Sequence, residues 1–203
     1  MKKFLIATKR EMTQRYRDDG TVQPVTVLAA GPCVVTAVRT AEKNGVTAVE
    51  LGMGTAKRAA KAQRTAQQKI GGPFRHVRSF RVDDVSGFEP GNKLDVGVFA
   101  IGDRIKVVGT SKGRGFQGVV RRHHFHGSPA THGHKDQLRK SGSIGSTGPQ
   151  RVLKGTRMAG RMGNERVTVR NLVIVEIRPE THELLVKGAV PGPRNALVLV
   201  ESI

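Results

Sequence analysis

The sequence predicts a mainly β protein, with a small closed β-barrel, a short helical insertion and a long, irregular, basic extension. Apolar, β-branched runs recur at both ends of the chain, separated by Asp-Gly or Asn-Gly turns in the N-terminal third, and no strand–helix–strand rhythm accompanies them. The middle of the chain is instead dense in glycine and basic residues and keeps no sustained apolar period.

The N-terminal third contains the first predicted strands. A short apolar run at Phe4–Ala7 predicts one strand, and Val22–Ala29, Cys33–Arg39 and Val46–Leu51 predict three more. Asp-Gly, Gly-Pro and Asn-Gly signals separate these runs, and this spacing is typical of antiparallel hairpins.

Thr55–Lys69 interrupts this pattern, because it is made of the strong helix formers Ala, Lys, Arg and Gln. It lacks a wide apolar stripe, so we expect a helix on the surface. Its basic side chains either face solvent or face RNA, and the sequence leaves both interpretations open.

Further strands are predicted at Phe74–Val82 and Asp103–Gly109. Near the C-terminus, Arg166–Arg178 alternates and then becomes almost continuously apolar, while Leu184–Val186 and Ala196–Val200 indicate two more strands.

Charge sets the broad class of partner. The 203 residues include 35 Lys or Arg against 16 Asp or Glu, a net charge of +19, which favours a polyanion such as nucleic acid. The single Cys33 allows no internal disulfide and fits a reducing compartment. The first apolar run is too short for a signal peptide and no run is long enough to span a bilayer, so we expect a cytoplasmic protein with no membrane partner.

The charge is concentrated in the middle of the chain. Ser111–Arg166 holds twelve Lys or Arg and eleven glycines, opposed only by Asp136 and Glu165. Such a segment cannot bury enough apolar surface to offset its ordering entropy, so we expect it to order on a polyanion. We therefore expect a barrel domain at residues 1–110 and 165–203, with the helical insertion near 55–70, and an extended arm at 111–164.

The candidate RNA-binding residues are the basic and histidine side chains of the arm and of the predicted helix. They are Lys112, Arg114, Arg121, Arg122, His123, His124, His126, His132, His134, Lys135, Arg139, Lys140, Arg151, Lys154, Arg157 and Arg161 in the arm, and Lys57, Arg58, Lys61 and Arg64 in the helix. Arg and Lys neutralise phosphates, while Arg and His can also stack on bases.

Other chemistries fit the arm less well. Gly113, Gly115 and Gly118 spell a GxGxxG, but no helical period follows and no strand–helix–strand unit surrounds it, so we predict no dinucleotide cofactor. The five arm histidines have only Asp136 as a local carboxylate and no nearby cysteine, which disfavours a metal site. No catalytic arrangement is recognisable, so we predict neither an enzyme nor a small-molecule substrate.

The same residues carry a family resemblance. Three motifs of the middle segment resemble the central signature of the universal large-subunit ribosomal protein L three, in its bacterial form. They are the run at Ser111–His134, SGSIG at Ser141–Gly145 and RVLKGTRMAGRMGNERVTVRNL at Arg151–Leu172. The flanks at Met12–Thr40 and Glu183–Pro193 resemble the family's barrel strands, so the resemblance covers nearly the whole chain.

The resemblance implies a structural constituent of the large ribosomal subunit. It implies a barrel on the subunit exterior, an internal arm that reaches through large-subunit rRNA toward the peptidyl transferase centre, rRNA binding early in assembly, and contacts with neighbouring ribosomal proteins. It implies no catalysis by the protein. A free nucleic-acid-binding protein that uses the same basic arm is the alternative, although a chain with no Trp and one Tyr offers few stacking aromatics.

Two positions depart from the family pattern. Glu11 precedes Met12-Thr13 where members usually have glycine, and glutamate lacks glycine's freedom at positive φ, so the first turn is expected to be reshaped. Some bacterial members carry a methylated glutamine just after the Gly-Ser-Ile-Gly run. That position is Ser146 here, so the resemblance implies that the modification is absent; Gln150 falls at a different offset.

Overall fold

The structure, a computed structural model, describes residues 2–203, which divide into two compact units. We name them the barrel unit, formed by the chain up to Thr110 together with Arg166–Ile203, and the basic unit, Ser111–Glu165. The barrel unit contains two sheets, and the basic unit contains a two-stranded ladder and a short helix.

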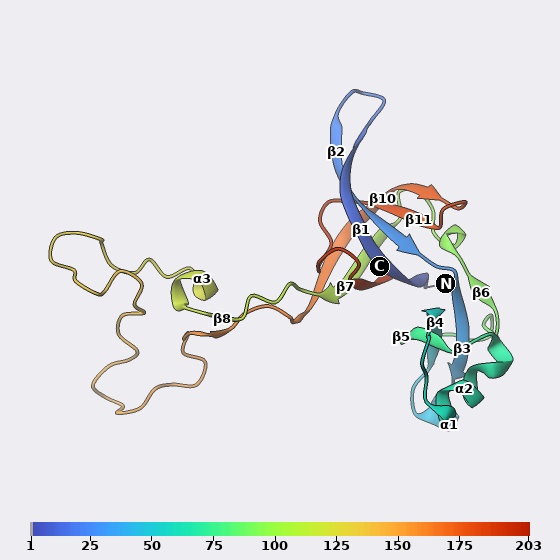
Figure 1. The fold of residues 1–203 in the computed structure, drawn as a ribbon, viewed down its shortest axis with the longest axis horizontal. Helices are drawn as coiled ribbons and strands as arrows, with labels where there is room; N and C mark the ends of the chain where they lie inside the picture. The colour runs from blue at the N-terminus through green and yellow to red at the C-terminus, as the bar shows by residue number, and fades with distance from the viewer. Residues whose placement is uncertain (1) are drawn as a thin grey trace. The chain divides into compact units, whose positions relative to one another are not determined.

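Six antiparallel strands close into a barrel in the order β1-β12-β7-β10-β11-β2 (Figure 1). The strands are β1 (Phe4–Tyr16), β2 (Val22–Ala30), β7 (Arg104–Thr110), β10 (Arg166–Arg178), β11 (Glu183–Lys187) and β12 (Leu197–Ser202). The prediction of a mainly β protein built on a small closed barrel is therefore confirmed.

Strand β1 is much longer than the predicted Phe4–Ala7. Those four residues are fully or almost fully buried, and they pair with β12. Beyond them the strand continues to Tyr16 as a hairpin with β2, which extends past the rest of the barrel (Figure 1). The extra residues are mostly polar and exposed, and backbone pairing with β2 keeps them extended. Because they show no apolar alternation, the sequence pattern does not indicate this part of the strand.

Glu11 lies in this extension, between the register positions Lys9 and Met12, where the β1–β2 ladder shifts. It is not among the residues with positive φ, and its carboxylate accepts a 2.8 Å hydrogen bond from Arg194. The expectation of a reshaped turn at Glu11 was wrong, because the position is bulged strand, which any residue can adopt.

A second antiparallel sheet of four strands, in the order β5-β4-β3-β6, was not foreseen as a separate layer. Its strands are β3 (Cys33–Arg39), β4 (Ala48–Thr55), β5 (Phe74–Arg81) and β6 (Lys93–Leu94), and α1 (Ala41–Asn44) and the 3₁₀ turn η2 (Val96–Val98) flank them. The rings of Phe4 in β1 and Phe80 in β5 stack with centroids 4.8 Å apart. Buried residues of both sheets therefore form one hydrophobic core.

The predicted helix at Thr55–Lys69 is shorter and begins later. The helix α2 spans Lys61–Gln67 and continues into the 3₁₀ turn η1 (Gln68–Ile70). Thr55 still pairs with Phe74 in the β4–β5 ladder, and the next residue, Ala56, donates its backbone N–H to Pro73 at 2.9 Å. Pairing with β5 thus holds the start of this segment in the sheet, overriding its helical propensity.

Candidate nucleic-acid interface

The basic unit is built on two antiparallel chain passages. Ser111 donates its backbone N–H to the Glu165 carbonyl at 2.9 Å, and Arg114 donates its own to Met162 at 2.9 Å. Further along, the passages pair as β8 (Phe116–Gln117) and β9 (Gly160–Arg161). This ladder gives the unit a defined base even though almost none of it is buried.

Glycines allow the two passages to approach closely. Gly163 has a φ of 75°, and a Cβ placed there would collide with the backbone of Lys112. A Cβ on Gly160 would lie 2.6 Å from the Arg122 guanidinium. Gly163 therefore requires glycine for packing within the unit, independently of any ligand, whereas at Gly160 the Arg122 side chain would have to move.

The GxGxxG motif is followed by a short helix that the sequence did not indicate. A short helix, α3 (Val119–His123), does begin directly after Gly118, whereas the sequence indicated none. It has only five residues, and no parallel strand follows it. The glycines at 113, 115 and 118 therefore belong to the two-passage ladder and its turn into α3, and no dinucleotide-binding unit surrounds them.

Three predicted RNA ligands have partners inside the unit. Arg122 donates to the Met158 carbonyl at 2.8 Å, and a ring nitrogen of His123 lies 3.1 Å from the same oxygen. Arg121 donates to the Gln117 side chain at 3.3 Å. These side chains connect α3 to Gln117 and Met158 of the same unit, so part of their role is to hold the unit's shape.

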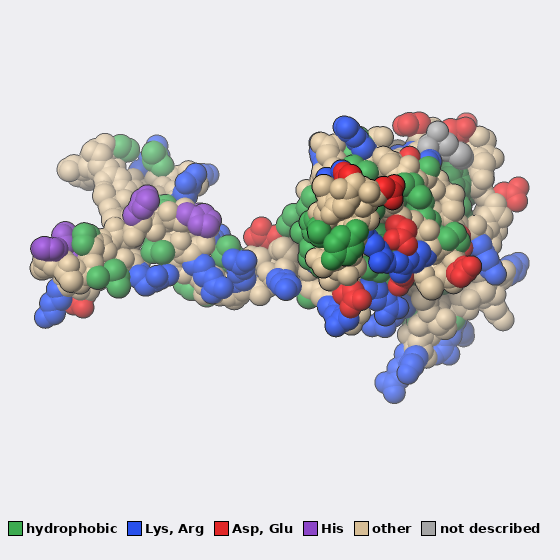
Figure 2. All heavy atoms as spheres, turned by 90° about the horizontal axis from the view of Figure 1, so that it is seen from above, with side chains coloured by type: hydrophobic (Ala, Val, Ile, Leu, Met, Phe, Trp, Pro, Cys, Tyr) green, Lys and Arg blue, Asp and Glu red, His purple; other side chains and the backbone are tan. Residues whose placement is uncertain are grey.

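The other cations of the basic unit have no such partners. Among residues 2–203, every ion pair joins side chains of the barrel unit, and none of the eleven Lys and Arg side chains of Ser111–Glu165 pairs with a carboxylate. Figure 2 shows Lys, Arg and His along the surface of this unit, with most acidic side chains on the barrel unit. Those with neither an ion pair nor a side-chain hydrogen bond are Lys112, Arg114, Lys135, Arg139, Lys140, Arg151, Lys154, Arg157 and Arg161.

The basic unit has almost no hydrophobic core. Val119 is its one buried hydrophobic residue among those described, and Phe116 is 77% exposed. An open groove of about 530 Å³ joins apolar and cationic side chains, among them Val119, Ile144, Met158, Arg139 and Lys140. A surface of this kind offers apolar contact for a base beside charge for a phosphate.

The histidines do not assemble into a metal centre. Within the described part of the chain, no group of three or more His, Cys, Asp or Glu side chains is placed to hold a metal ion. His124 and His132 have positive φ values of 60° and 59°, so they occupy turns. His126 and His134 are exposed, and all four keep their rings available to solvent.

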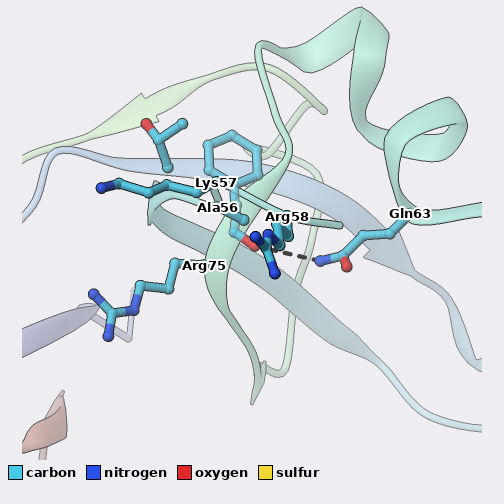
Figure 3. A pocket seen from close by; sticks show the side chains of 7 residues that line it. Ala56, Lys57, Arg58, Gln63 and Arg75 are labelled. Atoms are coloured by element: carbon cyan, nitrogen blue, oxygen red, sulfur yellow. Dashed lines mark hydrogen bonds between the residues drawn. The ribbon is translucent and has the colours of Figure 1, made fainter. Parts of the chain in front are cut away.

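The predicted residues outside the basic unit lie around α2. Lys57 and Arg58 precede the helix and border an open groove of about 540 Å³, while Lys61 and Arg64 are on the helix itself. Arg75 of β5 borders the same groove (Figure 3) and was missed, because the sequence showed it only as part of a strand. The absence of any acidic residue from 51 to 82 was the available signal.

Next to Arg75, His76 of β5 lies in electropositive surroundings. Partial burial, and then the charges of Arg75 and Arg78, lower the pKa of His76 in β5 below its usual value. The charges of Arg75 and Arg78 thus make the surroundings of His76 electropositive, which is the environment expected at an anion-binding surface.

Taken together, these features define the class. The chain combines a small closed barrel with a glycine-rich, acid-poor basic segment whose cations are exposed and unpaired, and this combination is typical of nucleic-acid-binding proteins. No helix among residues 2–203 is long and apolar enough to cross a membrane.

Comparison with known proteins identifies the family. The family described as Ribosomal protein L3 matches residues 88–183. Large ribosomal subunit protein uL3 of Herpetosiphon aurantiacus is 50% identical over 199 residues, covering 97% of this chain and 94% of the relative. The uL3 of a Roseiflexus species is 50% identical over 200 residues, covering 97% and 95%, and that of Dehalococcoides mccartyi is 46% identical over 198 residues, covering 97% and 96%.

The chain belongs to the ribosomal protein L3 family, as its sequence motifs indicated. This family is structural and non-enzymatic, and its members are components of the large subunit of the cytoplasmic ribosome.

Proposed function

We propose that this protein binds large-subunit rRNA early in subunit assembly, and that its basic unit reaches toward the peptidyl transferase centre and supports it from within the RNA. The barrel unit contacts neighbouring ribosomal proteins. The ligands are the arm and helix residues named from the sequence, with Arg121, Arg122 and His123 also holding the shape of the unit.

The observation that carries this proposal is the uncompensated charge of the basic unit. Its eleven Lys and Arg side chains form no ion pair among residues 2–203, and it has one buried hydrophobic residue. Because unscreened like charges repel, such a unit is stabilised by a polyanion that neutralises it. RNA meets this requirement, since its phosphates are regularly spaced along a backbone that a glycine-rich chain can approach closely.

Removing the basic unit tests the proposal. Thr110 pairs with Arg166 at the end of the β7–β10 ladder, so a two-residue Asn-Gly turn can replace residues 111–165. The shortened chain should melt cooperatively, because the hydrophobic core lies in the barrel unit, which it retains. It should fail to enter large subunits when these are assembled in vitro from rRNA and the remaining proteins.

The full-length chain, carried through the same assembly, is the control. Incorporation of the shortened chain at the full-length level would contradict a role for the basic unit in rRNA binding. Equal binding of the full-length chain to rRNA and to unrelated DNA would favour the alternative, a free nucleic-acid binder.

A further inference from the structure

A second acid-free stretch lies in the barrel unit. Residues 51–82 contain eight Lys or Arg and no Asp or Glu: Lys57, Arg58, Lys61, Arg64, Lys69, Arg75, Arg78 and Arg81. This stretch and the basic unit together carry nearly all of the chain's net charge of +19. The stretch is folded as β4, α2 and β5, and Lys57 and Arg58 lie in the loop between β4 and α2.

We propose that the groove bordered by Lys57, Arg58 and Arg75 is a separate RNA site, one that binds the phosphodiester backbone and reads no bases. This inference rests on the proposed function, because it takes rRNA as the partner. It adds Arg75 as a ligand, and it assigns to this site a chemistry different from that of the basic unit.

The groove is held in shape by hydrogen bonds between α2 and the start of β5. Gln63 donates its side-chain amide to the Phe74 carbonyl at 3.3 Å, and Phe74 donates its backbone N–H to the Gln67 side chain at 3.0 Å. Ala56 is tied to Pro73, as described above. The loop bearing Lys57 and Arg58 is thereby fixed at both ends against the strand that bears Arg75.

The three cations have no partners of their own. None of them forms an ion pair or a side-chain hydrogen bond with any residue from 2 to 203. Lys57 and Arg75 extend toward the same side of the groove in Figure 3. Three like charges around one open groove repel one another, and phosphate groups relieve that repulsion.

The surroundings of the groove favour phosphate contacts over stacking on aromatic rings or apolar docking. Phe74 and Phe80, the aromatic carbocycles of the stretch, are only 8% and 2% exposed. No large hydrophobic side chain between residues 51 and 82 is exposed, whereas the basic unit exposes Phe116. A site without an exposed Phe, Tyr or Trp lacks the usual platform for stacked bases, and one without an apolar anchor lacks the centre of a typical protein interface, so its cations favour phosphate contacts.

The test uses the full-length chain with Lys57→Gln, Arg58→Gln and Arg75→Gln combined. Affinity is measured against two RNA duplexes of equal length and unrelated sequence, from roughly 0.05 to 0.5 M salt. Each lost phosphate contact lowers the slope of log affinity against log salt by about 0.9, so the slope should fall by roughly 2 to 3. The loss should be the same on both duplexes.

Two further variants make the result specific. Arg10→Gln, Lys43→Gln and Lys187→Gln together remove three exposed cations elsewhere on the barrel unit and should change the slope much less. Lys57→Arg, Arg58→Lys and Arg75→Lys together keep the charge and should preserve the slope. Thermal melting of each variant shows that the barrel unit is folded.

An unchanged slope in the triple glutamine variant would overturn this inference while leaving the proposed function standing. So would a loss that differs between the two duplexes, which would mean that bases are read. Loss of binding to other large-subunit proteins, with RNA affinity intact, would reassign the groove to a protein partner. If the unaltered chain has no salt-dependent affinity for RNA at all, the proposed function itself fails.

Discussion

Replacing Arg139 and Lys140 together by glutamate removes two exposed, unpaired cations from the basic unit. Both border the groove that also contains Val119, Ile144 and Met158. The substitution changes eleven cations against two acids into nine cations against four. Neither side chain contributes a hydrogen bond or ion pair to the fold among the described residues, so the change acts on binding.

The size of the effect follows from counterion release. If each side chain neutralises one phosphate, the slope of log affinity against log salt falls by about 1.4 to 1.8, from roughly 0.7 per contact on single strands and 0.9 on duplexes. Affinity for rRNA should then drop by about 1.4 to 1.8 decades near 0.1 M salt, and the two curves should converge near roughly 1 M. Stability should change by less than about 0.5 kcal/mol, which moves the melting temperature by no more than about 2 °C.

Fluorescence anisotropy on a labelled rRNA fragment, titrated at four salt concentrations, measures the slope, and calorimetry measures the melting temperature. Lys43→Glu with Lys187→Glu is the matched control, because both side chains are exposed on the barrel unit outside either basic segment. An undiminished slope would refute phosphate binding at Arg139 and Lys140. A large drop in melting temperature would show that they support the core.

Three more outcomes are expected from the barrel unit. Gln67→Ala should destabilise it by about 1 to 3 kcal/mol in urea titrations, because the buried Phe74 N–H loses its acceptor; an unchanged midpoint would contradict this. Hydrogen bonds from Lys3 and from the backbone lower the pKa of Asp103, so its contribution to stability is present above the unfolded pKa near 3.9 and is lost as pH falls through the lower folded value. Asp103→Asn should therefore be less stable than the parent at pH 7 and converge with it in acid, and parallel stability curves would argue against this. Burial raises the pKa of Cys33 to about 11, so the thiol should resist alkylation at pH 8 until the chain is unfolded, and fast labelling of the folded protein would contradict that burial.

Strands made of an almost continuous or alternating apolar, β-branched run were predictable from the sequence. Arg166–Arg178 was predicted at the bounds that β10 has, and Cys33–Arg39 at those of β3. The polar half of β1 was missed, because its extended backbone depends on pairing with β2. The separate second sheet was missed for a related reason, because the sequence of a strand does not determine by itself which other strand it pairs with.

The candidate site was predictable in composition but not in arrangement. The density of Lys, Arg and Gly identified the basic unit, yet nothing in the sequence showed that Arg122 and His123 share the Met158 carbonyl, which is more than thirty positions away. Arg75 escaped notice because its partners at the groove lie across a turn and a helix. The sequence shows where basic residues occur along the chain, whereas the tertiary structure decides which of them lie close together in space.

Sedimentation of a cell lysate on a sucrose gradient, at magnesium levels that keep ribosomes intact and followed by a salt wash, tests the central claim most directly. We expect one copy of the protein on each large subunit and retention through the wash, because a basic unit embedded in folded RNA must be withdrawn as a whole. A protein held by surface phosphate contacts alone would lose about three to five decades of affinity between roughly 50 and 200 mM salt. Recovery at the top of the gradient, or easy release by the wash, would contradict a structural role inside the large subunit.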